Sequence, residues 1–378
     1  MENIGSNKIH ILFVMDGMEF GGGERVFVQL AAGLKDRYQL SAATMADMKF
    51  EEDLKSLGIK TYPVDMGSRF SFKPVYKILD IIKKNKVDFI HSQGARADFF
   101  ARVAGRIASI PYNICTIATP IEKFDIGVLR KGIYRFIDRL TESSVDRFIV
   151  VSDSLEKLLT SKRAISAKRV VKIYNGIELH KYHPAYSAGN LRIELGLSQD
   201  VPLIGSIGRI ILSKGLEYLL EATKEILILY PEARLLIVGE GPLKNKLILK
   251  CKKLGIINNV IFTGFVNDTR EILSSIDIFV FPSLSEGFPM VVLEAMAMAK
   301  PVVASRIDGV TEQISDGIEG ILVPPKDSSR LAEAIIKLIR DIELAKSLGT
   351  SARKKAEAEF SVEKMISETE KVYQSLLT

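Results

Sequence analysis

The chain has 378 residues, enough for two globular domains of roughly 150–200 residues each. With 47% hydrophobic and 26% charged residues and no compositionally simple tract, the sequence is not that of a disordered or fibrous protein. No apolar run approaches the ~20 residues that a membrane helix needs. The run that follows Lys8 meets Asp16 and is typical of a first strand, not of a signal peptide. A soluble, cytoplasmic protein is therefore expected.

The net charge of +6 is unevenly distributed. Residues 1–180 hold 28 Lys and Arg against 21 Asp and Glu, which gives +7, and the remainder holds 24 against 25, which gives −1. This excess favours an anionic partner of the N-terminal half, such as a phospholipid surface or a phosphorylated substrate, and a solvated basic face is the alternative. No nucleic-acid partner is expected. Cys115 and Cys251 fit no metal or redox spacing, so they are expected to be free thiols.

Apolar runs alternate with segments of helical period along the first half of the chain. The expected strands are residues 8–16, 38–45, 59–66, 87–93, 112–120, 145–153 and 169–177. The expected helices are residues 25–36, 50–58, 73–86, 97–109 and 154–162. Such alternation predicts an α/β domain with a mostly parallel sheet and helices on both faces.

The same pattern restarts after a polar, proline-containing linker at residues 180–190. Strands are expected at residues 201–210, 233–241, 259–266, 277–283, 301–305 and 320–325, with helices at 216–231, 243–255, 269–276 and 290–299. Residues 327–378 are expected to be helical throughout. The sequence therefore predicts two doubly wound domains joined near residue 182. Open sheets of this kind bind ligands outside the carboxyl ends of their strands, so two facing domains would leave a cleft between those ends.

Two glycine-rich turns follow strands. The run "FGGGE" at residues 20–24 lets a backbone approach a ligand closely at a helix N-terminus, although it is equally consistent with a flexible turn. It lacks the G-x-G-x-x-G spacing of dinucleotide-binding enzymes, and the chain has no Walker A motif. The turn "VGEGP" at residues 238–242 follows a strand and suits either a nucleotide base or no ligand at all.

The stretch "GSIGRIILSKG" at residues 205–215 opens the second domain. Arg209 offers a planar fork and Lys214 a point charge, and two such cations beside a helix N-terminus suit a diphosphate. The chain has no Asp-x-Asp element of the kind that holds a metal ion on a sugar donor. These two cations would then replace the metal, and two surface cations on a loop are the alternative.

The four histidines form no metal-ligand pattern. His180 and His183 lie in the linker without a cysteine or carboxylate at suitable spacing. His91 follows the apolar part of a strand and is either a partner of a sugar hydroxyl or a capping residue.

The stretch "PSLSEGFPMVVLEAMAMAKPVVAS" at residues 282–305 holds Glu286 and Glu294, eight positions apart. By themselves they could be a catalytic pair, a ligand clamp, or a helix cap and an ordinary polar residue. Together with "FGGGE", "GRIILSKG", "VGEGP", "VSDSLEKLL" and "IYNGIE", this stretch resembles the family 4 retaining glycosyltransferases over nearly the whole chain. The element Glu-x7-Glu is its most specific part.

The resemblance implies the GT-B architecture, which has two Rossmann-like doubly wound domains facing across a cleft. Residues 1–181 would bind the acceptor, residues 182–357 would bind the nucleotide sugar, and residues 358–378 would form a helix that crosses back to the N-terminal domain.

The family also implies the roles of single residues. Arg209, Lys214 and Glu286 would act on the donor diphosphate and the transferred sugar, and Glu294 would bind the ribose hydroxyls. The remaining donor-binding positions are Gly22, Gly23, Gly208, Gly239, Gly241, Gly287, Phe288, Pro289 and Met290. His91, Thr116 and Thr119 are the acceptor-side candidates.

One position departs from the family pattern. Many members carry a histidine where this chain has Ala118, in "CTIATP". The next segment, residues 122–144, contains an apolar stripe and basic side chains. It is expected to be either a helix that rests on anionic lipid at the inner face of the membrane or an ordinary packing helix.

The resulting prediction is a retaining, metal-independent glycosyltransferase without a cofactor. It would move a sugar from a nucleotide donor, UDP-linked in preference to GDP-mannose, to a cell-envelope glycan or a lipid-linked acceptor. The alternative that Ala118 suggests is an inert homologue that binds nucleotide or acts as a scaffold subunit. A nucleotide-sugar epimerase fits less well, since "SKG" and Glu-x7-Glu are both present.

Overall fold

The structure is a computed structural model that describes residues 8–17, 21–67, 71–119, 128–186, 189 and 191–377. The chain divides into two units, one formed by Met1–Asn175 with Glu363–Thr378 and the other by Gly176–Val362. The domain boundaries expected from the sequence, after residues 181 and 357, lie six and five residues from these divisions. Among the described residues, no helix has both the length and the apolar character needed to cross a membrane.

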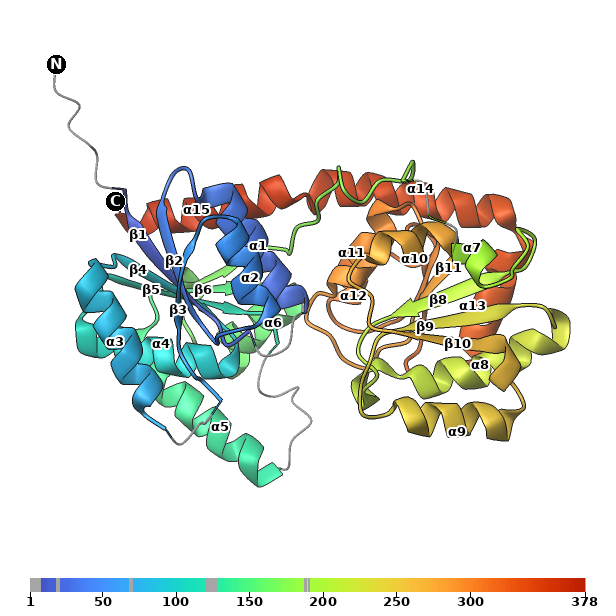
Figure 1. Ribbon diagram of the computed structural model, residues 1–378, viewed down its shortest axis with the longest axis horizontal. Helices are drawn as coiled ribbons and strands as arrows, with labels where there is room; N and C mark the ends of the chain where they lie inside the picture. The colour runs from blue at the N-terminus through green and yellow to red at the C-terminus, as the bar shows by residue number, and fades with distance from the viewer. Residues whose placement is uncertain are drawn as a thin grey trace, which may run out of the picture. The chain divides into compact units, whose positions relative to one another are not determined.

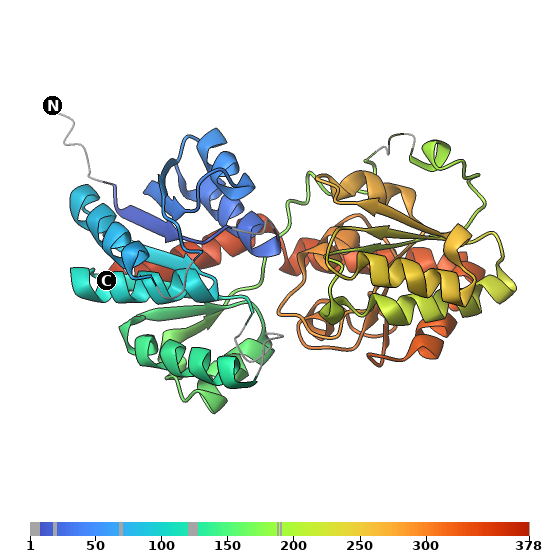
Figure 2. The same cartoon turned by 60° about the horizontal axis from the view of Figure 1, so that its bottom comes forward.

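The first unit is built on a seven-stranded parallel sheet with the order β3-β2-β1-β4-β5-β6-β7. Figures 1 and 2 show helices on both faces of this sheet, as the alternating pattern predicts. The strands are β1 (His10–Val14), β2 (Gln39–Thr44), β3 (Lys60–Pro63), β4 (Phe89–Gln93), β5 (Tyr112–Ile117), β6 (Arg147–Val150) and β7 (Val170–Lys172). The helices are α1 (Gly22–Leu34), α2 (Lys49–Ser56), α3 (Lys73–Asn85), α4 (Ala95–Ala108), α5 (Val128–Thr141), α6 (Asp153–Lys157) and α15 (Val362–Leu377).

Successive side chains of the central strands point to opposite faces of this sheet. Leu12 of β1 and Ile90 of β4 belong to a buried cluster with side chains of α3 and α4. Their neighbours Phe13 and His91 pack instead against Phe27 of α1, with ring centroids 5.0 and 4.9 Å from the Phe27 ring. Both faces are therefore apolar, as a parallel sheet covered by helices on both sides requires.

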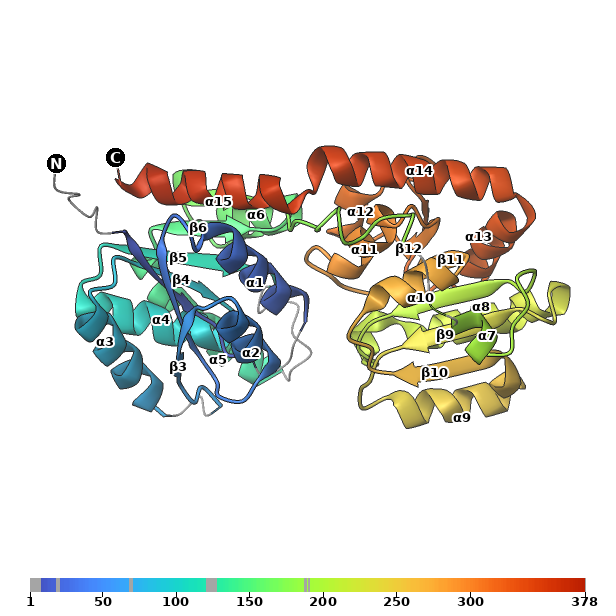
Figure 3. The same ribbon diagram turned by 45° about the horizontal axis from the view of Figure 1, so that its top comes forward.

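The C-terminal helix α15 completes the first unit. Tyr373 is fully buried, and its hydroxyl lies 2.6 Å from Nδ1 of His91. Figure 3 shows α15 beside α1, where a Cβ on Gly33 would overlap the side chain of Ile366. Arg37 and Glu370 form an ion pair between the same two parts of the chain. The expected return of the C-terminal helix to the N-terminal domain is confirmed.

The second unit has a six-stranded parallel sheet with the order β10-β9-β8-β11-β12-β13. Its strands are β8 (Leu203–Ile207), β9 (Arg234–Val238), β10 (Val260–Gly264), β11 (Ile278–Phe281), β12 (Val302–Ser305) and β13 (Ile321–Val323). Its helices are α7 (Leu191–Glu194), α8 (Leu216–Leu229), α9 (Lys244–Leu254), α10 (Thr269–Ser275), α11 (Met290–Ala297), α12 (Val310–Gln313), α13 (Ser328–Arg340) and α14 (Ile342–Glu359).

The C-terminal region is helical, as expected, but it is broken twice. Asp341 ends α13 and caps α14, because its carboxylate accepts a hydrogen bond of 2.9 Å from the backbone N–H of Leu344. At the second break, the carbonyl of Phe360 accepts from the N–H of Ile177 at 2.8 Å. A pairing with a distant segment of this kind leaves no mark in the helical period of the sequence.

Each sheet reverses its strand order once, between β1 and β4 in the first unit and between β8 and β11 in the second. At such a point the connections leave the two neighbouring strands in opposite directions, so their carboxyl ends are free to hold a ligand. Candidate site residues should therefore be sought in the turns that follow these four strands.

The buried hydroxyl of Tyr373 provides a test of how α15 is held. We expect Tyr373→Phe to lower the free energy of unfolding by about 1–3 kcal/mol, because the change leaves a buried nitrogen of His91 without its partner. Urea unfolding measures this difference. The matched control is Tyr76→Phe on the exposed face of α3, where no change is expected. Equal stability of the Tyr373→Phe protein and the wild type would contradict the account of this contact.

Candidate functional site

The turn after β8 is held against the turn after β9. The N–H of Gly208 donates to the carbonyl of Val238 at 2.9 Å, and the N–H of Ile210 donates to the carbonyl of Glu240 at 2.8 Å. Gly239 has a φ of +135°, and a Cβ there would overlap the carbonyl of Gly208. The glycine at this position is therefore required by a backbone-to-backbone contact. Gly241 makes the same kind of close approach to Ile210.

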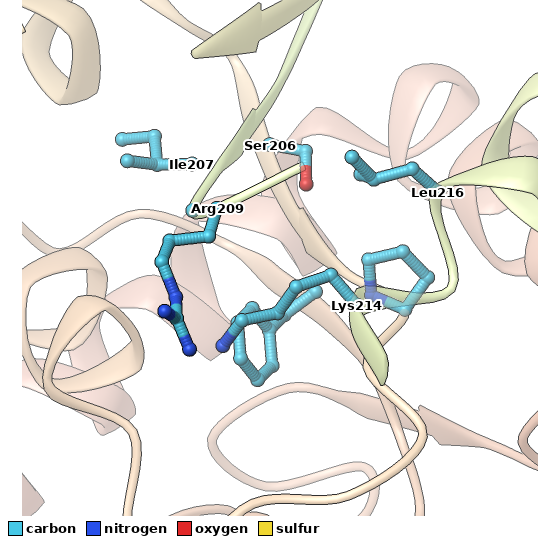
Figure 4. A pocket seen from close by; sticks show the side chains of 8 residues that line it. Ser206, Ile207, Arg209, Lys214 and Leu216 are labelled. Carbon is cyan, nitrogen blue, oxygen red and sulfur yellow. The ribbon is translucent and has the colours of Figure 1, made fainter. Parts of the chain in front are cut away.

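Arg209 and Lys214 extend from the β8 turn toward the same side (Figure 4). They line a small pocket of about 10 Å³, which is roughly the space of one water molecule. The ammonium group of Lys214 lies 5.2 Å from the ring centroid of Phe281, the last residue of β11, in a cation–π contact. The other lining residues are Ser206, Ile207, Gly208, Leu216 and Pro282.

Glu286 joins this group from the turn after β11. Its Oε1 lies 2.5 Å from Nζ of Lys214 and 2.6 Å from the hydroxyl of Ser283. The N–H of Leu284 donates to the carbonyl of Ser213 at 2.7 Å and ties the two turns together. The structure thus brings Arg209, Lys214 and Glu286 together at the switch point of the second sheet. Ser283 also belongs to this group and was not predicted from the sequence.

The backbone that follows Glu286 is held from α12 and from the end of α14. The amide of Gln313 donates to the carbonyl of Pro289 at 3.0 Å, and a Cβ on Gly309 would overlap the carbonyl of Gly287. The ring of Phe288 packs edge-on against Phe360, with centroids 5.4 Å apart. These contacts fix the path of the chain into α11, which begins at Met290.

Glu294 lies one turn further along α11 and is only 2% exposed. Its Oε2 accepts a hydrogen bond of 2.7 Å from the hydroxyl of Thr269 at the start of α10. This contact fixes the direction of the carboxylate. Its role as a ribose ligand stays a prediction.

The first unit has a second pocket, of about 210 Å³, at the carboxyl ends of β1, β4 and β5. Three of the predicted residues, Gly23, Thr116 and Thr119, line it together with Ala118, and Gly22 begins the adjacent helix α1. The pocket is also lined by Met15, Asp16, Glu24, Gln93, Gly94, Ala95, Asp98, Ile117 and Asp138. Gln93 and Asp98 were not predicted as site residues from the sequence, although Gln93 ends a strand next to the switch point.

His91 does not line this pocket. It is fully buried, its Nδ1 faces the hydroxyl of Tyr373, and its Nε2 lies 2.7 Å from the hydroxyl of Thr116. Burial lowers the pKa of His91 to about 3, so the ring is neutral. The two roles considered from the sequence were a sugar partner and a capping residue. The structure instead gives His91 a place in the core, where it supports Thr116 from behind.

The pocket of the first unit is acidic. The described lining residues include the carboxyl groups of Asp16, Glu24, Asp98 and Asp138 and no Lys, Arg or His. Asp138 is balanced by Arg102, whose Nη1 lies 2.5 Å from it. Burial raises the pKa of Asp98 to about 6 and also raises the pKa of Glu24. A pocket of this composition suits groups that donate hydrogen bonds, such as hydroxyls. The described lining of this pocket therefore does not suit the anionic partner that was expected for the basic N-terminal half.

The basic segment at residues 122–144 is described only from Val128 onward, where α5 begins. Ile133, Phe136 and Leu140 on this helix are exposed. The proposed lipid contact also involves Phe124 and Ile126, which lie outside the described residues, so it stays a prediction. In the described part of the chain, no three His, Cys, Asp or Glu side chains are grouped so that they could hold a metal ion.

Two family models match the chain, one in each half. Residues 20–181 match the model described as Glycosyltransferase Family 4, and residues 188–355 match that of Glycosyl transferases group 1. A Methanocaldococcus jannaschii protein named as an uncharacterized glycosyltransferase is 31% identical over 313 residues, which cover 80% of this chain and 79% of the relative.

A second relative is the Escherichia coli enzyme named UDP-Gal:alpha-D-GlcNAc-diphosphoundecaprenol alpha-1,3-galactosyltransferase. It is 25% identical over 305 residues, covering 80% of this chain and 79% of the relative.

Among solved structures, Anabaena HepE in complex with UDP-glucose matches with a TM-score of 0.86. The match covers 97% of this chain and all of the HepE chain at 22% identity, which shows a shared fold. Both sheets, the returning C-terminal helix and the matched models agree, and the chain belongs to the family 4 glycosyltransferases with the GT-B fold.

Proposed function

We propose that the protein is a retaining glycosyltransferase that uses a nucleotide-diphosphate sugar and needs no metal ion. The observation that carries this proposal is the meeting of Arg209, Lys214 and Glu286 at the switch point of the second sheet. Two cations at the carboxyl ends of parallel strands suit a diphosphate, and a carboxylate beside them suits the hydroxyls of the attached sugar.

The chemistry follows from where charge develops. As the glycosidic bond to phosphate breaks, the leaving nucleoside diphosphate gains negative charge, and fixed cations stabilise that charge. The sugar carbon becomes oxocarbenium-like, as in glycoside hydrolysis. An acceptor hydroxyl that attacks from the side of the leaving phosphate can pass its proton to that phosphate, and the configuration is then retained without a protein nucleophile.

The side chain of Glu294 and two stretches of backbone supply the rest of the proposed donor site. Glu294 binds the ribose hydroxyls, and the turn at Gly239–Gly241 borders the base. The loop Gly287–Met290 contacts the sugar or the phosphate. A UDP-sugar is the preferred donor and GDP-mannose the second choice, because the E. coli relative is named for UDP-galactose.

The acceptor is proposed to be a cell-envelope glycan or a lipid-linked sugar. The acidic pocket of the first unit suits a neutral sugar whose hydroxyls donate to carboxylates. The E. coli relative is named for an acceptor of this kind, a sugar on diphosphoundecaprenol. A lipid-linked acceptor would bring the protein to the inner face of the cytoplasmic membrane as a peripheral protein.

One observation favours a second candidate function. Ala118 lines the acceptor-side pocket, where many relatives are expected to carry a histidine. A protein that binds a nucleotide but transfers no sugar would fit that change, and it would act as a binding or scaffold subunit.

A donor panel tests the proposed activity. With UDP-, GDP- and ADP-sugars and a lipid-linked acceptor, mass spectrometry should detect a transfer product or slow donor hydrolysis for at least one donor. The rate should be the same with EDTA as with Mg²⁺, and Glu286→Ala should lower it at least ~100-fold, the cost of an interaction made in the transition state. Nucleotide binding without turnover of any donor would favour the scaffold instead.

The two cations can be tested separately from turnover. Arg209→Met and Lys214→Met should each weaken binding of UDP by about 10–100-fold in calorimetry, because each removes a charged hydrogen bond worth about 1.5–3 kcal/mol. Lys224→Met on the exposed face of α8 is the matched control and should bind as the wild type does. Unchanged affinity in both site variants would rule out this turn as the diphosphate site.

A further inference from the structure

We propose that Ser283 is a positioning residue that holds Glu286 in place while Lys214 exchanges partners. In the structure Lys214 pairs with Glu286, and when a donor binds it moves to the diphosphate. Glu286 stays on Ser283, and the contact that Lys214 gives up is replaced by one from a sugar hydroxyl. This inference rests on the proposed function and adds a role for a residue that the family resemblance does not assign here.

Lys214 and Ser283 donate to the same oxygen atom of Glu286. Oε1 of Glu286 accepts from both Nζ of Lys214, at 2.5 Å, and Oγ of Ser283, at 2.6 Å. Both bonds involve an ionised group, so both belong to the stronger class of hydrogen bonds. If the bond to Lys214 is lost, the bond to Ser283 still restricts the direction of the carboxylate.

The hydroxyl of Ser283 has one proton and two acceptors within reach. Oγ of Ser283 also lies 2.9 Å from the carbonyl of Ser213, but one proton serves one strong hydrogen bond at a time. That carbonyl already accepts from the N–H of Leu284 at 2.7 Å. The hydroxyl proton is therefore directed to the carboxylate, which is the shorter and charge-assisted contact.

The side chains of Ser283 and Lys214 differ in how far they can move. The side chain of Ser283 is short and fully buried, so it cannot follow a ligand. Lys214 has a long flexible stem and an ammonium group with three donors that can turn to a new partner. Since a diphosphate carries more negative charge than one carboxylate, Lys214 is the group that moves.

Lys214 lines the same pocket as Arg209 and Phe281. An anion that enters this pocket therefore meets both cations. Lys214 can turn from Glu286 to the diphosphate without leaving the pocket, and Ser283 keeps Glu286 from following it.

Calorimetry with two ligands separates the roles. UDP reports the diphosphate contacts, and UDP-glucose adds the sugar contacts; GDP and GDP-mannose replace them if GDP binds the wild type more tightly. We expect Ser283→Ala to change the Kd for the diphosphate less than twofold and to weaken the nucleotide sugar at least fivefold. A purely structural role would weaken both ligands by the same factor, and that result would overturn the proposal.

Ser275→Ala is the matched control. Ser275 is a buried serine of the same unit, and its hydroxyl donates to the carbonyl of Glu271 at 2.8 Å. Its loss should leave both Kd values unchanged. If this control shows the same selective loss as Ser283→Ala, the effect does not come from Glu286, and the proposal fails.

Glu286→Gln supplies an independent arm that does not depend on the folding of the serine variant. The amide oxygen can still accept from Ser283, but the negative charge that holds Lys214 is gone. Binding of UDP should therefore tighten at least threefold, although sugar transfer falls. Unchanged or weaker binding would show that Lys214 does not exchange partners. A wild type that binds neither UDP nor GDP would instead refute the proposed function itself.

Discussion

The ion pair between Lys214 and Glu286 depends on the order of the strands. The two residues are 72 positions apart, yet they follow β8 and β11, which are neighbours in the sheet. Because both strands run in the same direction, their following turns meet at one edge, and the reversal of strand order leaves that edge uncovered. A different strand order would separate the carboxylate from the cation. The candidate donor site is thus a product of sheet topology as much as of the motifs.

The pairing of Lys214 with Glu286 also affects the energetics of both charges. Both side chains are largely buried, and a buried charge without a partner is costly. In the structure each charge is paired with the other, and the nearby ring of Phe281 adds a contact for the ammonium group. A donor must therefore offer Lys214 a better partner than Glu286. In the proposed exchange, this competition would lower the affinity for the diphosphate alone and give the attached sugar a larger share of the binding energy.

The pockets of the two units are lined by ionisable groups of opposite sign. The pocket of the second unit is lined by Arg209 and Lys214, and that of the first unit is lined by four carboxyl groups. Such a division suits an anionic donor and a neutral acceptor hydroxyl. Among the described residues that line the first pocket, Asp138 is the one that pairs with two arginines, Arg102 and Arg163.

The periodic features of the sequence predicted the parallel sheets and most of the strand positions, since alternation of apolar runs and helices leaves few other arrangements. The turns that carry Arg209, Lys214 and Glu286 could be placed after strands from the sequence, and these strands are neighbours at the switch point. The donor-binding roles of these residues stay predictions. The burial of His91 was not predictable, because it depends on Tyr373, 282 positions away on α15. Ser283 was overlooked for a different reason. A serine in a turn carries no signal of its own, and its contact with Glu286, three positions away, is seen only in the structure.

Hydrogen exchange of the full chain with and without donor tests the central claim, which is that the donor binds at the switch point of the second sheet. Amides at residues 206–216 and 283–294 should exchange more slowly when a bound nucleotide sugar is present, because the ligand holds both turns closed. Protection confined to the first unit, or no protection at these two turns despite measurable binding, would contradict the account.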